Sequence, residues 1–196
     1  MKKNVGISYK ALAVIMAAVL ILGGAIGGTM AWLIDGTEAV ANTFTYGDIN
    51  IELVESTGNN YKIVPGVDLK KDPEVTVKAN SEECWLFVKV EEENWPTFTV
   101  KDTDTKKVNY SIADGWTHLD GKPGVYYRQV TSSNGDVSFG VLKDNQITVS
   151  DSLKKSEVDD VIAKTPKLTF TAYAVQMATI DDPDEAWKKA CDSSLY

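Results

Sequence analysis

Short stretches in which apolar and polar residues alternate recur along most of this chain, and they limit what it can fold into. Phe44 and Tyr46, and then Ile51 and Leu53, are each separated by one polar residue, with a turn signal at Gly47 between the two stretches. A period of two is typical of β-strands that bury one face. The residues that continue this pattern are 74–79, 85–91, 125–130, 137–142, 146–149 and 168–176. Many short strands and few helices predict a mainly all-β chain folded as an antiparallel β-sandwich.

The spacing of the strands predicts some connections and leaves the strand order open. Residues 98–100 and 108–112 have a weaker alternating pattern and predict two shorter strands. Residues 132–135, with the sequence Ser-Ser-Asn-Gly, predict a hairpin turn that joins strands 125–130 and 137–142. Composition and spacing alone do not separate an immunoglobulin-like strand order from a jelly roll.

Two segments near the C-terminus have helical signals. Residues 156–159 resemble a capping box and precede apolar residues at helical spacing, and Pro166 ends the segment. In residues 183–191, Asp182 is the expected N-cap and Pro183 the first helical residue. The residues of this second helix that share one face, and that we expect to point at the domain, are Ala186, Trp187, Ala190 and Cys191.

The first 31 residues differ from the rest and predict a cleavable secretory signal. Their charged side chains are Lys2, Lys3 and Lys10, and residues 11–28 carry no charge. Thr29 and Ala31 form a small-x-small pattern, so we expect a signal peptidase to cut between Ala31 and Trp32. The apolar run is about as long as a short membrane span, and an uncleaved anchor is the alternative.

Export would place the remaining chain, residues 32–196, outside the cytoplasm, and this limits its expected partners and the redox state of its cysteines. Loss of the three lysines changes the formal net charge from −8 to −11. So acidic a surface argues against nucleic acid and anionic lipid as partners. The membrane is then a partner only through the signal segment before cleavage. Cys84 and Cys191 both lie in the exported part and can pair in an oxidising compartment, but sequence separation does not test their geometry.

Patterns that indicate catalysis are missing from the sequence. The chain has one histidine, His118, in a region rich in glycine and aspartate, so the H-E-x-x-H pattern of zinc peptidases is absent. G-x-S-x-G, C-x-x-C, the P-loop and the calcium-loop pattern are absent too. We therefore predict no catalytic, metal-binding or cofactor-binding residues.

Aromatic residues are the remaining candidates for a binding site. Exposed, coplanar rings would form a sugar-binding platform, whereas rings on strands usually pack in the core or across strands. The candidates are Trp85, Trp95, Trp116, Tyr126 and Tyr127.

Several motifs resemble those of one known family. Residues 27–35 (GGTMAWLID) and 42–51 (NTFTYGDINI) resemble the N-terminal region of the TasA/camelysin family, which comprises exported proteins of Gram-positive bacteria. Residues 71–77, 84–90 and 170–176 are similar to its middle and last core strands. The N-terminal block is fairly specific, and the strand motifs are individually weak.

The resemblance implies a jelly-roll-like sandwich on the cell surface, with a signal that a SipW-type signal peptidase cuts. It further implies self-association into fibres of the extracellular biofilm matrix, in which each subunit donates an N-terminal strand to the next. The chain would then comprise a signal peptide (1–31), an extended segment (32–42) and a β-sandwich domain (43–196). The donor residues would be Trp32, Leu33, Ile34 and Val40.

Two other functions stay open from the sequence. Camelysin-type relatives imply a surface metalloendopeptidase, although a single histidine does not supply the usual zinc site. The aromatic residues would suit a monomeric secreted module that binds a glycan or a protein. The cysteines are a departure from the family's best-known member.

Overall fold

The computed structural model describes residues 34–35, 42–46, 48–57, 60–178 and 180–193, and in these residues strands outnumber helices. The early strands are β1 (Ile34–Asp35), β2 (Asn42–Tyr46), β3 (Ile51–Val54), β4 (Asn60–Tyr61), β5 (Leu69–Lys70), β6 (Glu74–Val77) and β7 (Cys84–Glu93). The later strands are β8 (Val108–Asn109), β9 (Thr117–His118), β10 (Val125–Val130), β11 (Val137–Gly140), β12 (Gln146–Val149) and β13 (Lys167–Gln176). The helical elements are the 3-10 turn η1 (Lys143–Asn145) and the helices α2 (Lys155–Lys164) and α3 (Pro183–Ser193).

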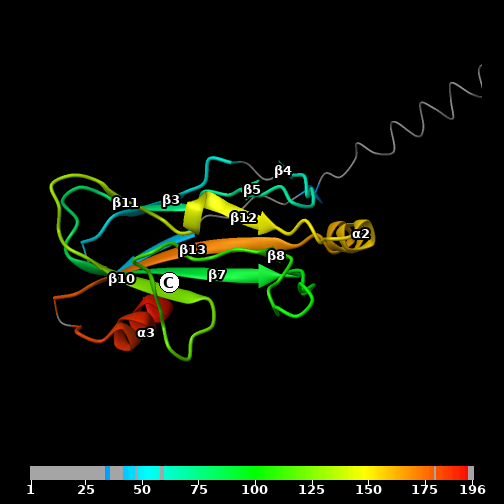
Figure 1. Ribbon diagram of the computed structural model, residues 1–196. Helices are drawn as coiled ribbons and strands as arrows, with labels where there is room; N and C mark the ends of the chain where they lie inside the picture. The colour runs from blue at the N-terminus through cyan, green and yellow to red at the C-terminus, as the bar shows by residue number, and fades with distance from the viewer. Residues whose placement is uncertain (1–33, 36–41, 47, 58–59, 179, 194–196) are drawn as a thin grey trace, which may run out of the picture. The chain divides into compact units, whose positions relative to one another are not determined.

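The main sheet has five strands in the order β2-β13-β7-β10-β9. At its centre, β7 and β13 pair antiparallel over their whole length, from Lys167 opposite Glu93 to Gln176 opposite Cys84. The β10 strand joins the other side of β7, and β2 lies parallel to β13 at one edge. This long central pair is the frame to which the other elements attach (Figure 1).

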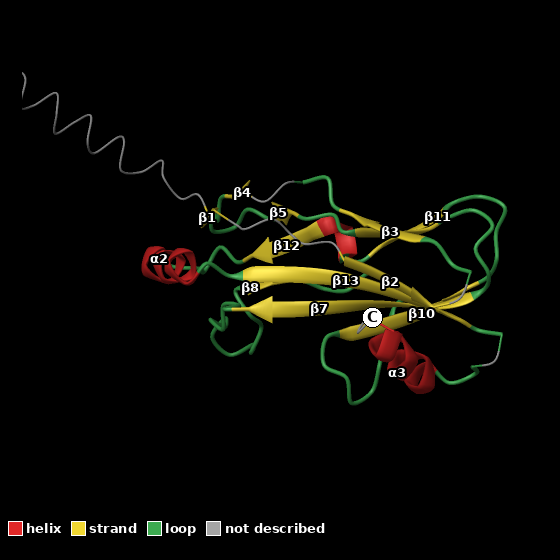
Figure 2. Ribbon diagram, turned by 180° about the vertical axis from the view of Figure 1, so that it is seen from behind, coloured by secondary structure: helices red, strands yellow, loops and turns green. Residues whose placement is uncertain are grey.

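Two smaller sheets form a second layer. Their strand orders are β11-β6-β3 and β5-β12-β8. Of these strands, β3, β5, β11 and β12 lie on one side of β7 and β13, and α3 lies on the other (Figures 1 and 2). The predicted all-β, sandwich-like fold is confirmed.

The central strand β7 is buried on both faces because it lies between the second layer and α3. Trp85 and Phe87 pack with Trp187 of α3. Leu86 and Val88, which alternation places on the opposite face, are both 0% exposed. A strand covered on both sides needs apolar residues at successive positions, and residues 84–88 meet this requirement.

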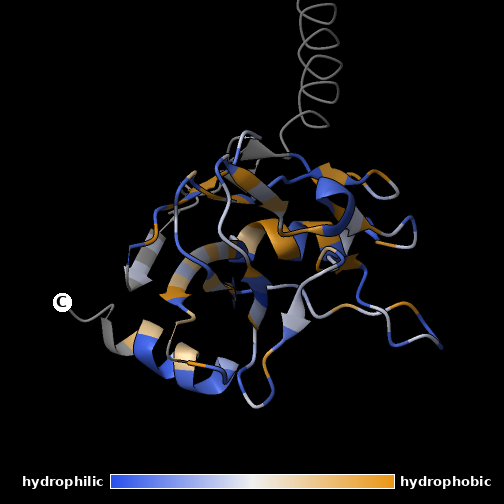
Figure 3. Ribbon diagram, turned by 90° about the vertical axis from the view of Figure 1, so that its left-hand side faces the viewer, coloured by the Kyte–Doolittle hydropathy of each residue, from blue (hydrophilic) through white to orange (hydrophobic). Residues whose placement is uncertain are grey.

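The helix α3 begins as the sequence predicts. The Asp182 carboxylate accepts a hydrogen bond from the backbone N–H of Asp184 at 3.2 Å, and Pro183 is the first helical residue. Ala186 and Trp187 are buried against the main sheet. Figure 3 shows hydrophobic and hydrophilic residues alternating along this helix, as expected when one face is covered.

The predicted hairpin at residues 132–135 is wrong. The β10 strand pairs with β7 and β9 in the main sheet, whereas β11 pairs with β6 in the second layer. The segment between them therefore crosses from one layer to the other. The backbone bends at Asn134 and Gly135, but a glycine-containing turn signal does not determine which strands pair.

The start of α2 and the pattern around residue 100 also differ from the predictions. The helix has Lys154 at its N-cap, and the Glu157 carboxylate accepts a hydrogen bond from the Lys154 backbone N–H at 2.7 Å. The predicted box at residues 156–159 thus lies two residues too late. The predicted strand 98–100 contributes only an isolated bridge between Thr99 and Lys106.

A nearly buried ion pair attaches α2 to the rest of the domain. The Lys107 ammonium lies 2.9 and 3.0 Å from the two carboxylate oxygens of Glu157 and 3.3 Å from the Ser152 carbonyl oxygen. The Lys107 and Glu157 side chains are 10% and 19% exposed, so loss of the ammonium leaves a partly shielded carboxylate without this partner.

We predict that Lys107→Met lowers the free energy of unfolding by about 1–3 kcal/mol, because it removes a charge-assisted hydrogen bond and leaves the partner behind. Urea denaturation followed by tryptophan fluorescence measures the change. The matched control is Lys155→Met, since Lys155 lies on the same helix and contacts Asp159 at 3.8 Å from an exposed position. The control should cost under about 0.5 kcal/mol, and equal losses in the two variants would contradict the prediction.

The same contact predicts sensitivity to acid. The Lys154 backbone N–H, followed by the Lys107 ammonium, lowers the pKa of Glu157 below its ordinary value of 4.5. A lowered pKa in the folded state gives stability that is present above pH 4.5 and is lost as the pH falls through the folded value. Glu157→Gln should therefore lose less stability than the wild type between about pH 7 and about pH 3 in urea denaturation. Asp159→Asn, a charge removal on the same helix, should keep the full acid loss.

Candidate functional site

The edge strand β2 is the candidate site for assembly. Residues Asn42–Tyr46 pair in parallel with residues 171–175 of β13, and this is the one parallel pair among the described strands. A parallel ladder is slightly less stable per residue than an antiparallel one. Among the described strands, none pairs with the other side of β2. An unpaired strand edge is a template for pairing with another chain.

The predicted donor segment lies only partly in the described residues. Ile34 belongs to β1 and pairs with Tyr61 of β4 in the same chain. The other donor candidates, Trp32, Leu33 and Val40, lie outside the described residues, as do the predicted cleavage residues Thr29 and Ala31. The donor and cleavage assignments therefore stay predictions. Among the described helices, none has the length and apolar character needed to cross a membrane.

The two cysteines are thiols in this structure, so the pairing that the sequence left open is not formed here. Cys84 begins β7, paired with Gln176 and Val130, and is completely buried. Burial raises the pKa of its thiol to about 12. A thiol in this state is a poor nucleophile, since the thiolate is the reactive form. Cys191 lies half-buried on α3.

His118 lies on the short strand β9, which the sequence did not predict. It is exposed and contacts Tyr126 edge-on, with ring centroids 5.4 Å apart. Within the described part of the chain, no group of three histidine, cysteine or acidic side chains is placed to hold a metal ion.

The aromatic candidates contact different partners and do not form an exposed flat surface. Trp85 is 3% exposed, donates from its indole nitrogen to the Ile180 carbonyl at 2.8 Å, and meets Tyr127 edge-on. Trp95 packs edge-on against Tyr110 at 5.6 Å. The five rings are all buried or half-buried, so the coplanar platform that a sugar site needs is not built from them.

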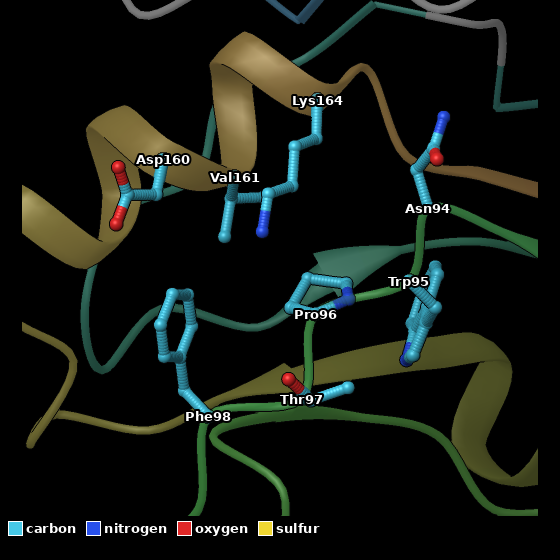
Figure 4. Close-up of a pocket in the computed structure, with 8 residues that line it drawn as sticks. All are labelled: Asn94, Trp95, Pro96, Thr97, Phe98, Asp160, Val161 and Lys164. Atoms are coloured by element: carbon cyan, nitrogen blue, oxygen red, sulfur yellow. The ribbon is translucent and has the colours of Figure 1, made fainter.

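One pocket of about 260 Å³ lies between the loop after β7 and the helix α2. Figure 4 shows Val161 and Lys164 of α2 facing Pro96 and Phe98 across it. The Trp95 indole nitrogen, also at this pocket, is buried without a hydrogen-bond partner among the described residues. The pocket gathers few polar groups that converge on one point, so it offers no catalytic arrangement.

The sequence reasoning missed Arg128. It is the single arginine of the chain, and its guanidinium lies against Phe139 and Trp116, at 3.7 and 5.3 Å from the ring centroids. It also lines a second pocket, of about 360 Å³. The available signal was compositional: one arginine among many lysines in an acidic chain.

Comparisons with known proteins give no assignment. No protein family, curated protein or solved structure matches the chain.

We predict unequal reactivity of the two thiols. In native protein treated with iodoacetamide, Cys84 should react at least about tenfold more slowly than Cys191, because burial keeps the Cys84 thiol protonated and shielded. Peptide mass spectrometry after timed labelling measures both rates. In guanidinium chloride the two rates should become similar. Equal rates in the native protein, or a peptide pair linked by a disulfide in protein recovered from the medium, would contradict the structure.

Proposed function

We propose that this chain is a secreted structural protein of a Gram-positive cell surface or biofilm matrix, of the TasA/camelysin kind. In this proposal its copies assemble into fibres by strand addition. Its functional residues would then be assembly residues, and it has no catalytic role. The N-terminal motifs in residues 27–51 support export and the family resemblance.

The observation that carries the assembly proposal is the position of β2. It lies at the edge of the main sheet, pairs in parallel, and directly follows the segment predicted to act as the donor. Residues 32–42 of a second copy would add to the open side of β2 or take its place on β13. Either event is β-augmentation, in which backbone hydrogen bonds supply the affinity.

The geometry of such an exchange leads to a filament. The donated segment and the accepting edge are different surfaces, so the contact runs head to tail and does not close on itself. Removal of the signal would control the process, because the donor segment gains a free end only when residues 1–31 are cut away.

Electron microscopy of residues 32–196 tests the proposal. We expect filaments in negative stain, increasing with salt, because the predicted mature chain has a net charge of −11 and copies repel each other at low ionic strength. Deletion of residues 32–42 should abolish the filaments and keep a β-type circular dichroism spectrum, because of the described strands it removes only β1 and the first residue of β2.

The control variant keeps residues 32–42 but shuffles them so that the apolar alternation is lost. It should also fail to polymerise, which separates donor pairing from an effect of chain length. Filaments that persist in both variants would refute strand donation. A monomer under all conditions would favour a secreted binding module, and chelator-sensitive cleavage of a protein substrate would favour the peptidase.

A further inference from the structure

The surroundings of Arg128 differ from those of the lysines that form ion pairs in this protein. Within the described residues, no carboxylate lies within 4.0 Å of its guanidinium, and its Nε atom is buried without a hydrogen-bond partner. The side chain is half-buried, and this partial burial lowers the pKa of Arg128, so the cation loses hydration that no ion pair replaces. The chain carries 28 acidic residues, so the missing partner is not explained by composition.

The aromatic contacts hold the guanidinium but do not satisfy its donors. The guanidinium lies over the Phe139 ring and near the Trp116 ring, which is turned 79° from it, and contacts with ring faces leave the N–H groups without conventional acceptors. Trp116 is itself fixed, since its indole nitrogen donates to the Gly140 carbonyl at 2.9 Å. The aromatic residues thus preorganise the guanidinium at small entropic cost to a ligand.

The pocket beside this guanidinium is lined by polar and aromatic groups. The lining residues are Trp85, Gly115, Thr117, Tyr127, Arg128 and Gln129. Gly115 leaves room at the edge of the guanidinium, because a methyl group at this position would come within 3.2 Å of Arg128 Nη2. The pocket has a volume of about 360 Å³, which suits a small chemical group rather than a large ligand.

The pocket also lies where the main sheet has an open edge. The β9 strand pairs only with Tyr126 and Tyr127 of β10. The remaining residues of β10, from Arg128 to Val130, pair with β7 on one side and with no described strand on the other. An extended peptide at this edge would bring its side chains close to the guanidinium.

We propose that Arg128 and this pocket form a binding site for a carboxylate. The planar fork of an arginine matches the two oxygens of a carboxylate, and Gly115, which has no side chain beside Nη2, leaves room for these oxygens on the pocket side. Thr117 and Gln129 provide further hydrogen-bonding groups at the rim. The ligand is either a free carboxylate or an aspartate or glutamate in an extended peptide.

The single arginine provides a specific reporter for the test. In the full chain labelled with ¹⁵N-arginine and kept in nonionic detergent, the side-chain Nε–H signal belongs to Arg128 alone. We expect a saturable shift of this signal with N-acetylglutamate amide, and none with sodium chloride at the same ionic strength. Absence of a saturable shift, or an equal response to inorganic phosphate, would overturn the carboxylate site.

Two variants connect the response to the pocket. Gln129→Glu places a carboxylate at the rim and should weaken binding of the probe by about tenfold or more, as should Thr117→Glu. The matched control is Thr148→Glu, which adds the same charge at an exposed position of β12 and should leave the titration unchanged. Equal weakening in all three variants would refute the site, since it would show a general charge effect.

A second comparison identifies the source of the carboxylate. A five-residue peptide with one central glutamate is titrated beside the blocked amino acid and beside the same peptide with glutamine. Binding of the peptide at least about tenfold tighter than the amino acid assigns the source to a protein strand at the open edge. Equal binding of the two assigns it to a free carboxylate, and equal binding of the glutamine peptide would overturn the proposal.

Discussion

The antiparallel pairing of β7 with β13 is the interaction on which the rest of this structure depends. The two strands are ten residues each and pair from end to end. Each also carries one further neighbour, β10 beside β7 and β2 beside β13. Because the central strands are buried on both faces, α3 and the second layer both have a surface to pack on. A polar side chain at Phe87 or Val88 would disturb one of these layers directly.

The alternation of apolar and polar residues predicted well where strands begin and end along the chain. Residues 146–149 coincide with β12, and residues 168–176 with nearly all of β13. The alternation did not predict which strands pair with each other, because that choice depends on tertiary packing. The turn at residues 132–135 is compatible with a hairpin, but β10 fits beside β7 and β11 fits beside β6. The sequence predicted the start of α2 two residues too late, and the cause is local. The Glu157 carboxylate accepts a hydrogen bond from the Lys154 backbone N–H, so the N-cap lies at Lys154.

The candidate sites were harder to predict than the fold, for a physical reason. Arg128, Trp116 and Phe139 come from three separate segments, and they meet only because β10 and β11 belong to different layers. No spacing along the chain encodes this contact. Trp85 shows the reverse case: it was a candidate for sugar binding, but its indole nitrogen reaches the Ile180 carbonyl in the core. A ring on a strand is typical of both roles, and burial distinguishes them.

The lengths and charges of the sheet edges favour β2 over the other edge strands as the place where the proposed assembly would add a strand. Long unpaired edges invite association, and proteins protect them by shortening them or by adding charge. Most edge strands here are only two residues long, and β3 carries Glu52, which pairs with Lys78. The β2 strand is the longest of the described edge strands, with five residues, and none of them is charged. Copies of so acidic a chain repel one another, so a contact that relies on backbone hydrogen bonds is favoured over one that relies on side-chain charge.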